Sequence, residues 1–113
     1  MGNDENIKGI LGYITEPVRN EVVSVPNTST QLCEQRLAVN KRKVLFIRNT
    51  STNANEVVTV HLGAEAAVAG TGIILQQNES FTDSTSEGYE CFQGVVNAIC
   101  AVAGPASVSI VER

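Results

Sequence analysis

The stretch that decides the fold class runs from Lys43 to Leu62 and reads KVLFIRN-TSTNAN-EVVTVHL. Its two ends are rich in β-branched residues, and its middle is a polar turn with several asparagines. In the second run, Val58, Val60 and Leu62 alternate with other residues, which predicts a strand with these three side chains facing the core. In the first run Val44 and Phe46 point one way and Leu45 and Ile47 the other, which predicts a strand partly covered on both faces. We expect the two strands to form a hairpin.

The same pattern continues on both sides of this stretch, and no helical period is sustained anywhere. It predicts an all-β protein: an antiparallel β-sandwich or jelly-roll-like small barrel of about seven to nine strands. The segment at 31–39 has odd apolar spacing, so a bulged strand and a short helical turn both remain open. We expect 80–82 to pair with 73–75 across a turn, and 83–88 to be a loop. The further strands are expected at 18–25, 73–75, 80–82, 95–102 and 106–111.

The first seventeen residues differ from the rest, so we expect a single domain at 18–113 preceded by an N-terminal arm or edge segment at 1–17. Gly9 and Gly12 oppose a stable helix there. Two interpretations remain open: an edge strand folded on its own core, or an arm lying on a neighbouring subunit. The apolar residues of this segment are the first part of a candidate partner interface: Ile7, Ile10, Leu11, Tyr13 and Ile14.

Composition excludes several classes of function. The chain has 113 residues, which fits about one domain. Its net charge of −4 argues against nonspecific nucleic-acid binding. Aromatic residues make up 4% of the sequence and Trp is absent, which argues against a platform that stacks bases or sugars. No apolar run is long enough to span a bilayer. From the net charge we therefore expect no nucleic-acid partner, and from the short apolar runs no membrane partner.

Charge is divided along the sequence. Five cations fall between Arg36 and Arg48, and the segment from Asn49 to Glu112 has no Lys or Arg but seven acidic residues. One interpretation is that a basic surface of one protomer meets an acidic surface of a neighbour. The other, which we favour, is that basic and acidic segments lie side by side within one fold. Under the first interpretation, the candidate partner interface also includes Lys41, Arg42 and Lys43.

Residues suited to catalysis or metal binding are sparse, and we predict no catalytic, cofactor or metal site. His61 is the only histidine and is expected to point away from Val60 and Leu62. One histidine cannot supply the converging ligands of a cupin-type metal centre. The three cysteines lack the C-x-x-C spacing of zinc or redox motifs, and their odd number fits a reducing compartment. The acidic residues between 79 and 90 do not form a D-x-D-x-D-G calcium loop.

The stretch from Arg42 to Glu112, about two thirds of the sequence, resembles a pattern found in small virion proteins of tailed bacteriophages. In that pattern a basic-led strand ends at Asn, a second strand ends in Leu-Gly, and a Gly-led strand ends in a turn with Glu-Ser. A final hairpin has the form apolar-x-Ala-Ile and then Val-x-Val-x-Glu. Gln77 and Asn78 depart from the usual Pro-Gly of the turn. The matching segments are Arg42–Asn49, Val60–Gly63, Gly72–Phe81, Val96–Ile99 and Val108–Glu112.

The resemblance implies a non-enzymatic β-sandwich module of a virion, made in the host cytoplasm and carried on the particle. Such proteins coat capsids, plug necks or form tail and fibre parts, usually as homo-oligomers. The small size, the apolar N-terminal arm and the complementary charge favour a capsid decoration protein that binds the major capsid protein, with a homotrimer as the favoured oligomer. The alternatives are a tail, neck or fibre component, or a module that binds host-surface carbohydrate.

Overall fold

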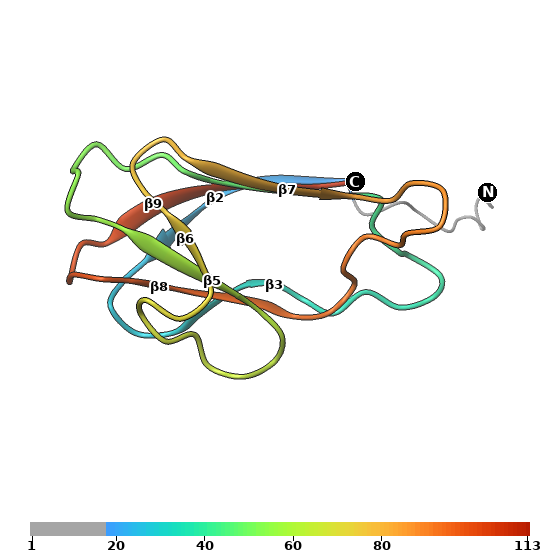
Figure 1. Ribbon diagram of the computed structural model, residues 1–113, viewed down its shortest axis with the longest axis horizontal. Coiled ribbons are helices and arrows are strands. Elements are labelled where there is room, and N and C mark those ends of the chain that lie inside the picture. Colours follow the sequence, from blue (N-terminus) through green and yellow to red (C-terminus); the bar gives the residue numbers. More distant parts are fainter. Residues whose placement is uncertain (1–17) are drawn as a thin grey trace, which may run out of the picture.

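A computed structural model describes residues 18–113, which form eight antiparallel strands and no helix, so the all-β prediction is confirmed (Figure 1). Two four-stranded sheets pack face to face, in the strand orders β2-β9-β4-β7 and β3-β8-β5-β6. The strands are β2 Arg19–Val25, β3 Thr30–Cys33, β4 Val44–Asn49, β5 Val58–Leu62, β6 Ile73–Leu75, β7 Ser80–Ser84, β8 Val96–Cys100 and β9 Ala106–Glu112.

The topology is that of a jelly roll. Among the described strands, β2 pairs with β9, β3 with β8, β4 with β7, and β5 with β6, as in one long hairpin. That hairpin is rolled up so that β4 also pairs with β9 and β5 also pairs with β8. Eight strands in two sheets with this connectivity define the jelly-roll architecture. Of the two forms expected from the sequence, a β-sandwich and a jelly-roll-like barrel, the structure is a β-sandwich with jelly-roll connectivity.

The expected pairing of strands that are neighbours in sequence is wrong. β4 and β5 do not form a hairpin, because they lie in different sheets, as do β6 and β7, and also β8 and β9. Asp83 and Ser84, expected in a loop, belong to β7. The polar connection between β4 and β5 crosses from one sheet to the other. Strong turn composition marks where a strand ends, but it does not decide whether the next strand pairs with it.

Asn49 organises one of these crossings. Its buried side-chain amide donates to the backbone oxygen of Glu56, just before β5, at 2.8 Å and to that of Leu75, the last residue of β6, at 3.0 Å. Its backbone oxygen accepts from Asn78, which has the left-handed φ of 68° that asparagine tolerates in tight turns. The end of β4 is thereby fixed to the opposite sheet.

The core lies between the inner faces of the two sheets, where every second side chain points inward. β9 shows this most plainly, since its residues alternate between buried and partly exposed along its whole length. Cys33, Cys91 and Cys100 are buried and unpaired by disulfides. The largest fully buried apolar side chains are Leu32, Leu45, Ile47, Ile110, Val25, Val58, Val60, Val96 and Val108.

The two outer faces differ in what covers them. The connection at 63–72 folds back over the β3-β8-β5-β6 sheet, where the backbone of Gly70 donates to the Thr59 hydroxyl at 3.0 Å and Asn97 donates to the Glu65 carbonyl at 2.7 Å (Figure 1). Thr59 and Asn97 are accordingly buried. No described segment covers the outer face of the β2-β9-β4-β7 sheet in the same way.

The segment expected as a second strand at 31–39 is strand only in part. β3 ends at Cys33, and its register against β8 shifts between Gln31 and Cys33, which confirms the bulge that the odd spacing left open. The rest forms the loop that leads to β4, and Leu37 and Val39 are exposed in it.

Candidate functional site

A cluster of charged side chains is buried at one end of the sandwich. Glu112, at the end of β9, is fully buried, and its carboxylate is the centre of the cluster. Arg19 of β2 donates to it at 3.1 Å, and Arg36 of the β3–β4 loop donates to its other oxygen. Arg42 lies 3.9 Å away, from the same loop. The cluster therefore ties two segments far apart from β9 in sequence, β2 and the β3–β4 loop, to that last strand.

Arg42 is fully buried, so it is not available as part of a partner interface, and that interpretation of the residue is wrong. Its guanidinium donates to the backbone oxygens of Phe92 at 2.5 Å, Gly94 at 3.2 Å and Glu34 at 2.8 Å. Gln93 strengthens the same junction by hydrogen bonding to both the backbone N–H and the backbone oxygen of Arg42. Arg42 thus joins the loop after β3 to the segment before β8.

The ionisation of Glu112 reflects two opposing effects. Burial disfavours its charged form, but hydrogen bonds from the Cys33 thiol and from Arg36, with the positive charges of Arg36 and Arg42, outweigh it and lower the pKa of Glu112. Burial, together with the hydrogen bond to Glu112 and its negative charge, raises the pKa of Cys33 to about 12. Cys33 therefore stays a thiol at neutral pH and is not poised as a nucleophile.

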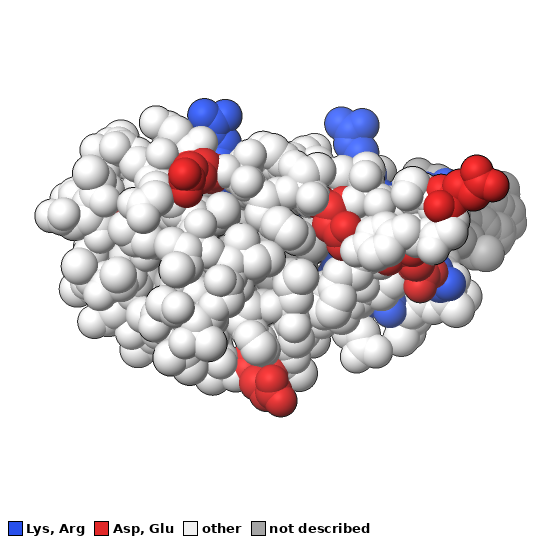
Figure 2. All heavy atoms as spheres, in the orientation of Figure 1, with Lys and Arg blue, Asp and Glu red and all other residues white. Residues whose placement is uncertain are grey.

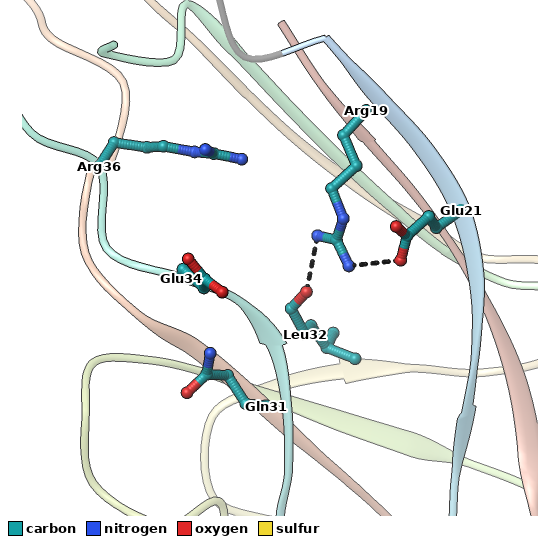
Figure 3. A pocket seen from close by; sticks show the side chains of 6 residues that line it. All are labelled: Arg19, Glu21, Gln31, Leu32, Glu34 and Arg36. Atoms are coloured by element: carbon teal, nitrogen blue, oxygen red, sulfur yellow. Dashed lines mark hydrogen bonds and ion pairs between the residues drawn. The ribbon is translucent and has the colours of Figure 1, made fainter. Parts of the chain in front are cut away.

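Beside this cluster a polar pocket of about 430 Å³ opens between the edge strands β2 and β3 (Figure 3). Arg19 and Arg36 extend into it from opposite sides, and Arg19 is held there by Glu21 at 2.8 Å and by the Leu32 carbonyl at 2.7 Å. Among residues 18–113, the side chains of Gln31 and Glu34 at this pocket make no hydrogen bond or ion pair. The pocket can hold a small polar group, but its cations and anions balance, so it does not select one sign of charge.

The pairing of charges favours the second of the two interpretations of the charge pattern. Lys41 pairs with Glu90 at 2.6 Å, both on the surface, and Arg36 pairs with Glu112 in the interior. Segments that differ in charge along the sequence are thus neighbours within one chain. On the side of the molecule shown in Figure 2 the acidic side chains are scattered and form no single patch.

The residues considered for chemistry stay apart in the fold. His61 is partly exposed, packs over Gly63 and lies 3.4 Å from the exposed Glu65. The side chain of Asp83 accepts hydrogen bonds from the Tyr89 hydroxyl and the Phe92 backbone, which are structural contacts of the β7–β8 loop. No group of three or more His, Cys, Asp or Glu within 18–113 is placed to hold a metal ion.

A strip of apolar side chains crosses the open outer face of the β2-β9-β4-β7 sheet. Phe46 of β4 lies directly opposite Val111 of β9, and Val44 is its neighbour on the same face of β4. Val22 of β2 lies diagonally from Val111 and is 69% exposed. We call these four residues the outer strip. It is bordered by serines and threonines of β7 and β9, by Asn20 opposite Val111, and by the exposed Arg48 next to Phe46 on β4.

The remaining candidate interface residues can be placed only in part. Lys41 is exposed, and Lys43 lies directly before β4. Ile7, Ile10, Leu11, Tyr13 and Ile14 lie outside the described residues. Within 18–113 no helix has the length and apolarity needed to cross a membrane. No protein family model, curated protein or solved structure matches the chain.

The lowered pKa of Glu112 predicts that acid destabilises the fold. A carboxylate whose pKa is lower in the folded state adds stability above its unfolded pKa of about 4.3, and this is lost as the pH falls through the folded value. Urea unfolding between about pH 7 and about pH 3 should show this loss. The variant Glu21→Gln, which alters an exposed carboxylate, should keep most of the acid sensitivity. Stability that is unchanged across this range would contradict the assignment.

Proposed function

We propose that this chain is a non-enzymatic structural protein of a tailed-bacteriophage virion, and that it binds and stabilises the head shell as a capsid decoration protein. The segments that resemble small phage virion proteins fall on β4, the end of β5, the β6–β7 connection, β8 and β9. They are thus strands and turns of one jelly roll, an architecture that viral capsid domains share with lectins and cupins.

The observation that carries the proposal is the outer strip. Phe46 and Val111 form a cross-strand pair on a sheet face that the described chain leaves open, whereas the connection at 63–72 covers the opposite sheet. Apolar side chains on an outer face rimmed by polar residues are typical of protein interaction sites, and Val22 is exposed while the other three are partly exposed. A protein that works by adding buried interface to a shell needs a face of this kind.

The oligomeric part of the proposal comes from the resemblance, which favours a homotrimer on the particle. Charge attraction between protomers does not support it, since Arg36, Arg42 and Lys41 find acidic partners within their own chain. We therefore expect the association to depend mainly on apolar contact, and to weaken little as salt screens exposed charges over about 10 Å at 0.1 M.

The proposal is tested on particles assembled with and without the chain. Particles that lack it should release their DNA at a lower temperature, and adding back the purified full-length chain should restore the higher one, because a ligand that binds only the intact shell stabilises it. Particles that neither bind the added chain at micromolar concentration nor change in heat resistance would contradict the proposal.

A second candidate is a tail or fibre module that binds host-surface carbohydrate, and the polar pocket favours it. Gln31 and Glu34 have polar groups there that a sugar hydroxyl can reach (Figure 3). No aromatic side chain lines the pocket, which removes the usual stacking surface for a sugar ring. A glycan array with the full-length chain decides between the two, since selective binding would favour this second candidate.

A further inference from the structure

The outer strip is an apolar surface that the packing of the described strands leaves partly exposed. A strand face that packs on nothing is normally polar, as in the serines and threonines of β7, yet four apolar side chains cross three strands here. Val18, directly before β2, adds another exposed valine at the same end of the edge strand. This face therefore carries more exposed apolar surface than the outward residues of β7 do.

The chain carries a segment of matching chemistry next to this face. Residues 7–14 read IKGILGYI, with five large apolar residues and one charge. This segment joins the fold at Val18, immediately before β2, which is an edge strand of the same sheet. Its two glycines allow close approach of backbone to a flat surface.

The backbone preferences at Glu16 and Pro17 favour the outer strip of a neighbouring copy as the surface on which residues 7–14 lie. Proline has a fixed φ, and the residue before it, Glu16, is biased to extended conformations. A reversal at 15–17 would return the segment to its own sheet, whereas the extended conformation that Glu16 favours carries it away from that sheet. An extended chain instead continues the line of β2 outward, and each residue adds about 3.3–3.6 Å of reach.

We propose that the apolar segment at residues 7–14 of one copy lies on the outer strip of a second copy. The contact buries Val22, Phe46 and Val111 beneath the isoleucines and Tyr13 of the neighbour. The inference rests on the oligomeric part of the proposed function and names its interface. Exchange of arms in this way links copies through apolar contact. Such a link needs no ion pairs between copies, and Arg36 and Lys41 already have acidic partners within their own chain.

The test is photo-crosslinking in the full-length chain with benzoylphenylalanine in place of Tyr13. Unlabelled and ¹⁵N-labelled protein are mixed before irradiation, so that adducts within one copy and between copies differ in mass. We expect mixed-isotope adducts on the outer faces of β2, β4 and β9. Adducts confined to one copy, adducts on other surfaces or an absence of adducts would each overturn the inference. Particles that still contain the chain would then leave the proposed function standing.

A matched pair of variants gives a second readout. Val22→Asp should lower the yield of adducts between copies by about tenfold or more, because an aspartate on an apolar contact loses hydration without gaining a partner. Val68→Asp changes a valine that is similarly exposed, at 59% against 69%, but lies in the connection over the other sheet. It should leave the yield unchanged. Equal effects of the two variants, each with the wild-type circular dichroism spectrum, would overturn the inference.

Discussion

Replacing Arg42 with methionine is expected to lower the free energy of unfolding by about 3–5 kcal/mol, the range seen when one partner of a buried charged network is removed. Methionine keeps much of the volume but has no donor. The carbonyl oxygens of Phe92, Gly94 and Glu34 would each lose the hydrogen bond that Arg42 donates. An acceptor left unsatisfied in the interior costs about 1–3 kcal/mol. Urea unfolding with a fitted slope measures the change.

Lys41 supplies the matched control because it precedes Arg42 in the sequence and carries the same charge. Its ion pair with Glu90 is exposed on both sides, and such pairs contribute about 0–1 kcal/mol. Lys41→Met should therefore change the stability by less than about 1 kcal/mol. Similar losses for the two variants would show that net charge matters and that the buried contacts of Arg42 do not.

Replacing Glu112 with glutamine is expected to cost about 3–5 kcal/mol as well, because it leaves the surrounding guanidinium groups without their shared counter-ion. Glutamine has nearly the same shape, so the loss reports charge and not packing. Arg36 and Arg19 both donate to the carboxylate in the native fold. The same variant should also remove much of the acid sensitivity of the protein, since the titrating carboxylate is gone.

The control for this variant is Glu90→Gln, which neutralises an exposed carboxylate in the pair with Lys41. It should shift the stability by less than about 1 kcal/mol. A Glu112→Gln protein as stable as the wild type at neutral pH, and still as sensitive to acid, would show that the cluster does not hold this end of the sandwich together.

Strand positions could be predicted from local pattern, but strand partners could not. The runs that contain β4 and β5 have β-branched residues with strand-like alternation, and both form strands. Their pairing depends on the loop at 50–57 crossing the sandwich, and Asn49 fixes that crossing by contacts with Glu56 and Leu75. Leu75 is far from Asn49 in sequence, so no local window contains this information. Turn composition alone favoured the hairpin that the jelly roll does not have.

The buried charge cluster was missed, although the sequence holds a sign of it. Glu112 has the same parity in β9 as Val108 and Ile110, so an inward carboxylate is implied once those two are assigned to the core. Its partners cannot be identified in this way, since Arg19 lies ninety-three residues away. Arg42 was assigned to the candidate partner interface because it lies in the cationic stretch between Arg36 and Arg48. Only the fold shows that its guanidinium lies among backbone carbonyls.

The most direct test of the proposed function is the number of copies of this chain in a purified virion, measured by quantitative mass spectrometry against isotope-labelled peptides. A protein that decorates a head shell repeats with the shell lattice. We therefore predict many copies per particle, in a fixed ratio to the major capsid protein. Purified, infectious particles that contain none of the chain would contradict the account.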